Sequence, residues 1–591
     1  MRQRKDIADR YKWDLTQIYP NVDAWRKDYE ELKILLDKVE LFKGKLNDKE
    51  VLLQYYEFCK KQDILMDKVV TYVYLNHLVN MEDDMYNQML AMIENMSNDF
   101  AIKSAFVLPE LNSYDVEYLE SLLEDERFKL HYMDIKDLIK HKPHILPLAL
   151  EELVTKVGTF SGTFSDVFDG FDCVDVKFDK ATDSKGKEHE VTNSNFGKLM
   201  KNRDRVLREN AYKSMYNAYG DMSTTIANNY IGSVKKDWFF ANSYKYKSTL
   251  ESNLDSNDLT EKVYYTLINN VNKHLDLNHR YIALKKKMLG LDKIYSYDLS
   301  LPLSTMDREF EYDDACKIVV DALRILGDDY VQMLEFAINN NWLDVYATKS
   351  KDTGGCNISL YGVHSFVLLN HEGTFNDVST IAHELGHALH YYFTEKTQPF
   401  EYSSLTIFLA EIASTTNEVL LKKYMYKTAK DKDEKIFILQ EFISLITSTL
   451  FGQTMFSEYE DFAHKLVENN QPITKDILLN KYDELQTKYN GDVVEKLDIR
   501  KYGCLMVPHF YRAYYVYSYA TGITCAINFA RNCIDGPEGV EKYRKFLASG
   551  TSNYPLEILK ECGIDLETDQ PYDILFDEMK WALDELESLS N

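Results

Sequence analysis

Apolar residues recur at every third or fourth position through most of this chain, which is the spacing of one buried face of an α-helix. The segments DAWRKDYEELKILLDKVELFKG (residues 23–44) and YVYLNHLVNMEDDMYNQMLAMIENMSNDF (residues 72–100) both show this pattern, and the first ends on Gly44. The spacing predicts helix after helix over residues 25–122. Eleven prolines and 23 glycines in 591 residues fit long helices with short connections.

Two segments depart from the helical spacing. FDCVDVKFDKATDSKGKEHEV (residues 171–191) alternates apolar and polar positions on both sides of a Ser-Lys-Gly turn, which predicts a β-hairpin. GGCNISLYGVHSFVLLNHEG (residues 354–373) is also strand-like and is followed by a helical pattern. We therefore expect a mostly α-helical protein with small β elements. We divide it into a helical region over 1–110, a helical region with the hairpin over 111–200, and a third domain over 201–591.

The charge balance narrows the choice of partners. The chain carries 69 Lys and Arg residues against 95 Asp and Glu, a net charge of −26. Such a surface repels phosphate backbones and anionic lipids, so we expect neither a nucleic-acid partner nor a membrane partner. The opening MRQRKDIADRYKWDLTQIYP has no apolar run of the kind a signal peptide carries, and no long uncharged apolar stretch follows it. Eight scattered cysteines without a C-x-x-C pair are typical of reduced thiols and predict a cytoplasmic location.

The strongest chemical signal is VSTIAHELGHALHYYF (residues 378–393). On a helix, His383 and His387 stand on one face, and two imidazoles at this spacing can bind the same metal ion. Glu384 is rotated by about 100° from His383, too far to bind that ion directly but well placed to contact a water molecule on it. This H-E-x-x-H pattern is typical of zinc proteases, and the alternative is a buried helix that happens to carry histidines.

A catalytic zinc requires a third protein ligand and one open position. One known extension of the motif would place a glycine at position 390 and a histidine at position 393, but this chain has His390 and Phe393. His390 lies two turns beyond His383, about 10 Å along the helix axis, so we expect a supporting or packed histidine there. The third ligand must come from elsewhere in the chain.

Glu411 is the stronger candidate for that ligand. It lies within SSLTIFLAEIASTTNEVLLKKYM (residues 403–425), flanked on both sides by apolar residues. A carboxylate in such surroundings requires a cation, either a metal ion or a Lys or Arg side chain. Glu418, seven residues further on, could orient a ligand histidine or be a solvated charge, and Asp377 leaves the same two options open.

At this point the chain resembles a known family. HELGHALH followed by FLAEIAS, together with YKWDLTQIYP, SFVLLN and HFYRAYYVYSYATG, resembles the oligoendopeptidase F branch of the thimet oligopeptidase-like zinc peptidases, over residues 10–580 or so. The resemblance implies one Zn²⁺ ion held by His383, His387 and Glu411, with Glu384 as the general base. It also implies a two-lobed helical body around a deep channel, a β element near the active-site helix and a zinc-peptidase catalytic domain over 201–591. Substrates would be short peptides cut at internal bonds.

The resemblance also places substrate-side residues in HFYRAYYVYSYATG. It implies His509 and Tyr514 as catalytic donors and Tyr511 and Tyr517 as substrate contacts, while the alternative for each tyrosine is packing in a chain that has 43 of them. The strand around Phe366–Asn370 is expected to pair with the peptide backbone, and Gly354-Gly355 to form either a closing loop or an ordinary turn. Two other functions stay open: a zinc carboxypeptidase on a similar helical frame, and a peptide-binding helical protein without catalysis.

Overall fold

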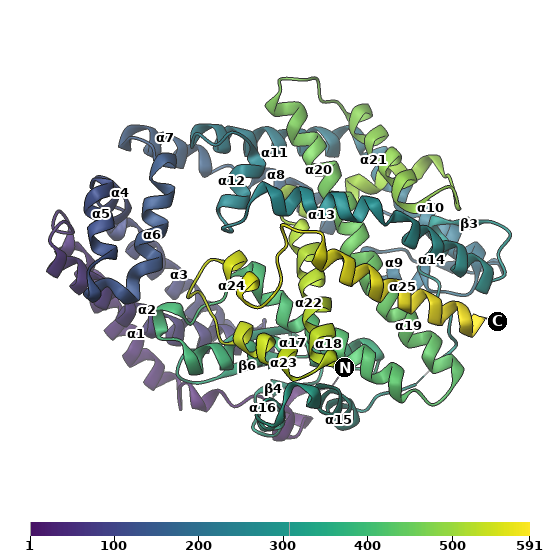
Figure 1. Ribbon diagram of the computed structural model, residues 1–591, viewed down its shortest axis with the longest axis horizontal. Helices are drawn as coiled ribbons and strands as arrows, with labels where there is room; N and C mark the ends of the chain where they lie inside the picture. Colours follow the sequence, from purple (N-terminus) through teal and green to yellow (C-terminus); the bar gives the residue numbers. More distant parts are fainter. Residues whose placement is uncertain (1, 307, 591) are drawn as a thin grey trace. The chain divides into compact units, whose positions relative to one another are not determined.

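The computed structural model describes residues 2–306 and 308–590 and is mostly α-helical, as the spacing predicts (Figure 1). Its contacts divide the chain into two compact units, each made of three segments. Unit 1 comprises residues 1–145, 308–421 and 529–563, and unit 2 comprises residues 146–307, 422–528 and 564–591. The contiguous regions expected above (1–110, 111–200 and 201–591) stay a prediction.

Unit 1 holds the helices of both the N-terminal region and the H-E-x-x-H segment. Its elements are α1 (Val22–Leu36), α2 (Lys49–Val79), α3 (Asp84–Ser104), α4 (Val107–Asn112), α5 (Val116–Leu123), α6 (Tyr132–His141), α15 (Tyr312–Leu323), α16 (Asp328–Asn339), β4 (Leu343–Asp344), β5 (Cys356–Ser359), β6 (Ser365–Leu368), α17 (Phe375–Thr397), the first part of α18 (Ile407–Thr428), the last part of α22 (Tyr517–Asp535), α23 (Pro537–Leu547) and α24 (Pro555–Glu561).

Unit 2 contains the last part of α18 and the first part of α22, together with further helices and strands. They are α7 (Leu148–Gly158), α8 (Thr163–Gly170), a π-helical turn (Phe171–Asp175), β1 (Ala181–Thr182), β2 (Glu188–His189), α9 (Asn193–Met200), α10 (Arg205–Asp221), α11 (Ser223–Ser243), α12 (Thr249–Asp255), α13 (Glu261–Lys273), α14 (Leu275–Met288), β3 (Ile294–Tyr295), α19 (Lys432–Ile446), a π-helical segment (Thr447–Gly452), α20 (Gln453–Glu468), α21 (Lys475–Asn490), β7 (Val494–Glu495) and α25 (Gln570–Ser590).

The predicted hairpin is present but shorter than the alternation suggests. β1 pairs with β2 in antiparallel register, with Ala181 opposite His189 and Thr182 opposite Glu188. The start of the expected hairpin, Phe171–Asp175, is helical instead. The alternating pattern was therefore misleading for these residues. So short a run of alternating residues also fits a single helical turn that continues α8.

A three-stranded sheet precedes the helix that carries the histidines. The strand order is β4-β6-β5, with β6 parallel to β4 and antiparallel to β5. β6 is completely buried, and its Phe366 and Leu368 belong to the same hydrophobic cluster as Trp13 and Trp25. The opening YKWDLTQIYP segment and α1–α3 thus form one core with this sheet, which holds the sheet at the start of α17.

One helical run of the described residues, Lys432–Glu468, is long and apolar enough to meet the length and composition of a membrane span. Half of the apolar window in this run is buried inside the protein. Core helices of water-soluble proteins meet the same criterion, so this is weak evidence, and the expected absence of a membrane partner stays a prediction.

Candidate metal centre

α17 begins at a capping box that explains the role of Asp377. The Thr374 hydroxyl accepts a hydrogen bond from the Asp377 backbone N–H, and the Asp377 carboxylate accepts one from the Thr374 N–H at 2.8 Å. This reciprocal arrangement satisfies two backbone donors at the helix start. Asp377 therefore caps the helix and does not orient a histidine.

Gly386 allows α17 and α18 to approach closely. A Cβ atom added at Gly386 would lie 2.6 Å from Ser414 Cα and 3.0 Å from Ala413 O. Asn417 of α18 strengthens this contact, since its Nδ2 donates to Ala382 O at 3.1 Å while its Oδ1 accepts from the Tyr330 hydroxyl. The glycine inside the motif, which lowers helix propensity by about 1 kcal/mol, is thus explained by the helix crossing.

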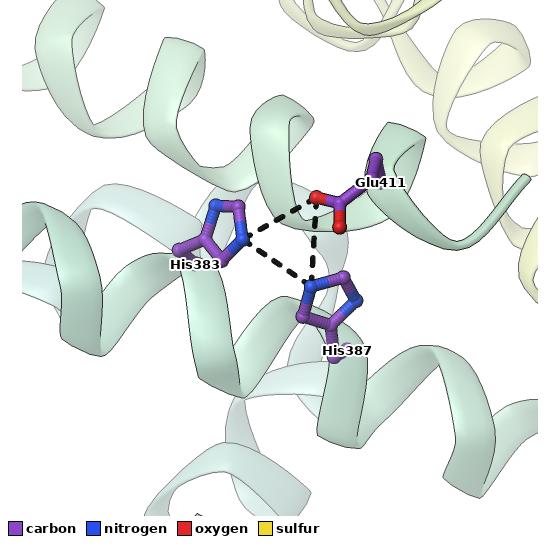
Figure 2. A group of neighbouring side chains, drawn as sticks. All are labelled: His383, His387 and Glu411. Atoms are coloured by element: carbon purple, nitrogen blue, oxygen red, sulfur yellow. Dashed lines mark hydrogen bonds and ion pairs between the residues drawn. The ribbon is translucent and has the colours of Figure 1, made fainter. Parts of the chain in front are cut away.

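The crossing brings the three expected metal ligands together (Figure 2). His383 Nε2 lies 3.2 Å from His387 Nε2 and 3.4 Å from Glu411 Oε2, and His387 Nε2 lies 3.7 Å from Glu411 Oε2. In a tetrahedron with ligands at 2.0–2.1 Å from zinc, the ligand atoms are about 3.3–3.4 Å apart. The observed triangle therefore fits a zinc ion with a fourth position left open.

Glu411 itself points away from its apolar neighbours. Its side chain is 45% exposed, whereas Phe408, Leu409, Ile412 and Ala413 are buried. The Ser414 hydroxyl donates to Glu411 Oε2 at 3.2 Å, which leaves the carboxylate directed at the two histidines. No Lys or Arg of the described part of the chain forms an ion pair with it, so the alternative of a salt bridge finds no support.

Glu418 contacts His383 at the ring nitrogen that is not part of the ligand triangle. Its Oε1 lies 2.9 Å from His383 Nδ1, and its Oε2 accepts from the Ser379 hydroxyl at 2.8 Å. A carboxylate on Nδ1 fixes the ring orientation and leaves Nε2 free for a metal. Of the two options that the sequence left open for Glu418, the structure supports the orienting one.

His390 is a packed histidine. Its ring is 1% exposed and lies against Phe546, with ring centroids 4.9 Å apart. Burial lowers the pKa of His390 to about 3, so the ring is neutral. It is not a member of the ligand triangle.

The pKa values of the side chains in this site are shifted by burial and by close carboxylates. Burial by itself would lower the pKa of His383, but hydrogen bonds with Glu411 and Glu418 raise it to about 10. Burial and the nearby His383 lower the pKa of His387 to about 4. Glu384 is 6% exposed, and burial raises its pKa to about 7. A carboxyl group in that range can both accept and release a proton near neutral pH.

A cavity of about 410 Å³ opens in front of the triangle. Its lining consists of residues from β5, α17 (Tyr391 among them) and α18, together with Gly355 and Leu405. The Gly354-Gly355 turn lies directly over the base, because a Cβ added at Gly355 would be 3.3 Å from Glu384 Oε1. Asn370 holds this turn, since its Nδ2 donates to the carbonyls of Asp352 and Gly354 at 2.9 Å each.

The expected substrate-side residues lie in unit 2. His509 is exposed, whereas Tyr511, Tyr514 and Tyr517 are buried, and the Tyr514 hydroxyl contacts Asp461 Oδ1 at 3.3 Å. The roles assigned to these four residues stay a prediction. Two tyrosines beside His509 are partly exposed: Tyr515, whose ring centroid is 6.0 Å from that of His509, and Tyr519, whose hydroxyl is 3.4 Å from His509 Nε2.

Sequence reasoning passed over two residues that the structure places at these sites. Ser379 lies four residues before His383, and this i, i+4 spacing on one helix face would have indicated a supporting role. Tyr519 lies next to Tyr515, and the ring centroids of these two tyrosines are 5.4 Å apart. Helical phase was the available signal for Ser379 but not for Tyr519, because Tyr515 precedes the start of α22.

Comparison with known proteins identifies the family. The model of peptidase family M3 matches residues 198–577, and the model described as oligopeptidase F matches residues 110–178. The chain belongs to peptidase family M3.

Relatives of this M3 peptidase match it over nearly its whole length. It is 34% identical to oligopeptidase PepF of Bacillus subtilis, over 99% of this chain and 88% of that one. It is 35% identical to the group B oligopeptidase PepB of Streptococcus agalactiae, over 99% and 98% of the two chains. These matches place the M3 peptidase in the oligoendopeptidase F branch and confirm the family and enzyme class expected from its motifs.

Solved structures agree with the fold. The crystal structure of oligoendopeptidase-F from Enterococcus faecium is 27% identical, with a TM-score of 0.74 over 95% of this chain and 98% of that one. A structure from Chlamydophila abortus is 31% identical, with a TM-score of 0.93 over the full length of both chains. The expected mostly α-helical fold with small sheets is therefore confirmed.

Proposed function

We propose that His383, His387 and Glu411 hold one zinc ion and that this M3 peptidase hydrolyses internal bonds of short peptides, with Glu384 as general base. The observation that carries the proposal is the triangle of two imidazole nitrogens and one carboxylate oxygen, with sides of 3.2, 3.4 and 3.7 Å. The names of the relatives, oligopeptidase and oligoendopeptidase, support peptides as the substrates.

Zinc, when bound, supplies a Lewis acid that acidifies water and polarises a carbonyl group. The remaining chemistry belongs to Glu384, which lies next to the first ligand in the chain and faces the same cavity. Its carboxylate takes a proton from the attacking water and later delivers that proton to the leaving amine. Because Glu384 is almost fully buried, its carboxylate is poorly solvated and the proton affinity is high enough for both transfers.

An extended peptide can pair with a sheet only at an edge strand, because a central strand already uses its backbone hydrogen bonds on both sides. The expectation that the strand at Phe366–Asn370 does this is wrong for β6, because β6 is the central strand and pairs on both sides. β5 is an edge strand, and its Cys356, Asn357 and Ser359 line the cavity beside Glu384. We propose that an extended peptide pairs with β5, which would bind main chain more than side chains.

For the substrate-side donors we keep His509 and Tyr514 as catalytic groups and Tyr511 and Tyr517 as substrate contacts. His509 has the exposure that such a role requires. Tyr514 is 1% exposed and its hydroxyl contacts Asp461, so a role in catalysis requires that it exchange this partner. A cytoplasmic location and the absence of nucleic-acid partners likewise remain predictions from the sequence.

The assignment of the base and the third ligand can be tested together. Glu384→Gln should keep zinc bound but lower peptide turnover by about 10²–10⁴-fold, since it removes the proton acceptor and leaves the ligands unchanged. Glu411→Ala should instead weaken zinc binding. Zinc content by atomic absorption, read beside turnover of a quenched fluorescent peptide, separates the two effects. Turnover retained in Glu384→Gln would reject the base, and undiminished zinc in Glu411→Ala would reject the ligand.

A carboxypeptidase on the same helical frame is distinguished by where it cuts. An internal cut should occur equally in a peptide with a free C-terminus and in the same peptide amidated. Mass spectrometry of the products gives the position of the cut. Loss of cleavage on amidation, or release of single C-terminal residues, would favour the carboxypeptidase.

A further inference from the structure

Unit 2 contains a second cavity that shares no residue with the metal cavity. Its volume is about 350 Å³, and it lies among α9, α10, α14, α20, α21 and the π-helical segment Thr447–Gly452. This volume is within the range of about 300–1,000 Å³ that small-molecule sites occupy. The peptidase chemistry described above makes no use of this cavity.

A buried lysine lines the cavity without a counter-ion. Lys285 of α14 is 2% exposed, and its Nζ donates to the carbonyl of Leu299 at 2.5 Å. It forms no ion pair with any carboxylate of the described residues, and Glu441 acts on it only from a distance. An ammonium group has three N–H donors, so two of them remain beyond the hydrogen bond to Leu299, and the Tyr281 ring, 5.7 Å away, is the other contact. A buried charge in this state is unfavourable unless an anion meets it.

The other cation of the cavity is already paired. Arg500 donates from Nε to Asp483 Oδ1 at 2.6 Å and from Nη2 to Asp483 O at 3.1 Å.

The protonation state of Lys285 depends on its burial and on nearby charges. Burial favours loss of the proton from Lys285, and repulsion from Lys201 acts in the same direction. Burial lowers the pKa of Lys285 to about 8, so the amine is still mostly protonated at neutral pH. The cavity therefore contains one positive charge that has no carboxylate counter-ion among the described residues.

The rest of the lining indicates what kind of anion would fit. The lining includes hydroxyl and amide groups and also six apolar side chains, which we call the apolar wall: Phe196, Met200, Ile282, Leu299, Phe451 and Met455. A free inorganic anion would leave that wall in contact with water. An anion with an apolar body would cover the wall and remove its surface from water.

We propose that this cavity is a binding site for a small organic carboxylate, with the carboxylate on Lys285 Nζ and an apolar body against the wall. The proposal does not depend on the peptidase function, because no lining residue belongs to the metal cavity.

The test uses the full-length zinc-loaded protein and three probes at pH 7. Phenylacetate has the carboxylate and an apolar ring, phenylacetamide has the same shape without the charge, and inorganic phosphate has the charge without the body. Dissociation constants come from ligand-observed NMR titrations of the wild type, of Lys285→Met and of Lys286→Met. Lys286 is the adjacent residue, is not part of the cavity lining and serves as the matched control.

We expect phenylacetate to bind the wild type and Lys286→Met equally, and to bind Lys285→Met at least about tenfold more weakly, as expected for the loss of a charged hydrogen-bond donor. Phenylacetamide and phosphate should bind more weakly than phenylacetate. Equal phenylacetate affinity in wild type and Lys285→Met would overturn the proposal, because the carboxylate would then bind without Lys285. Phosphate binding as tight as phenylacetate would also overturn it, because the apolar wall would then play no part.

A second measurement covers the case in which Lys285→Met does not fold. Reductive methylation of the wild type, quantified at Lys285 and Lys286 by mass spectrometry, reports whether the amine is covered. Saturating phenylacetate should reduce labelling of Lys285 severalfold and leave Lys286 unchanged. Unchanged labelling of Lys285 would contradict the proposal without any substitution.

Discussion

Glu418 offers a sharp test of how this protein builds its metal centre, because it contacts a ligand and not the metal. Its Oε1 lies 2.9 Å from His383 Nδ1, and the Ser379 hydroxyl supports its other oxygen at 2.8 Å. Glu418→Gln keeps the shape and one acceptor oxygen but removes the negative charge. The substitution should therefore weaken zinc binding without removing a ligand.

The size of the effect follows from the kind of hydrogen bond. A hydrogen bond to a charged acceptor contributes about 1.5–3 kcal/mol, against about 0.5–1.5 kcal/mol for a neutral one. The difference of about 1–1.5 kcal/mol corresponds to a loss of about tenfold in zinc affinity, within the range of about 10–100-fold seen for such supporting carboxylates. Ser379→Ala, which removes a contact one step further from His383, should cost less.

The assay is a competition between the protein and a chromophoric chelator for zinc, followed by peptide turnover at saturating zinc. Glu395→Gln is the matched control. Glu395 lies on α17, the helix that carries His383, and its carboxylate accepts a hydrogen bond from the Gly362 N–H, away from the ligand triangle. Zinc affinity that is unchanged in Glu418→Gln, or lowered equally in Glu395→Gln, would refute the view that Glu418 orients His383.

Three further predictions concern the helix crossing, the turn over the base and the buried lysine. Gly386→Ala should abolish zinc binding or soluble expression, because the new Cβ would lie 2.6 Å from Ser414 Cα; zinc content near that of the wild type would contradict this. Asn370→Ala should lower kcat by up to about tenfold at unchanged zinc affinity, because it removes two hydrogen bonds to the turn over Glu384; an effect on zinc alone would be inconsistent. Because burial lowers the pKa of Lys285 to about 8, the pH profile of its reductive methylation should have its midpoint well below the value of about 10.4 for a solvated lysine; a midpoint at that ordinary value would show that the amine is solvated.

The sequence predicted those features of the candidate metal centre that can be recognised within a single stretch of the chain. The i, i+4 spacing of His383 and His387 determines their common face, and an acidic residue in an apolar run indicated Glu411. The alternatives for Glu418 stayed open because its role depends on how α18 crosses α17. That crossing depends on the contact at Gly386, which local periodicity does not describe.

The tyrosines after His509 show a second limit. Their helical phase is interrupted at Tyr514, which has a φ of +49° and whose backbone N–H donates to the buried Glu460 at 2.6 Å. Counting three or four residues across that point therefore assigns the wrong face, so the exposed and buried tyrosines could not be separated from the sequence.

The burial of Lys285 is a third feature that local sequence did not predict. It begins the run Lys285-Lys286-Lys287, which on composition alone indicates a solvated surface. Only its phase with Asn278, Tyr281 and Ile282 on α14 places it on the buried face, and all three of these residues line the same cavity. The cavity itself depends on segments far apart in the chain, which no local pattern brings together.

The most direct test of the central claim is an anomalous-difference map at the zinc edge from crystals of the zinc-loaded protein. The account predicts one peak, about 2.0–2.2 Å from His383 Nε2, His387 Nε2 and a carboxylate oxygen of Glu411. A peak at another place, or no peak among these three side chains after zinc loading, would contradict it.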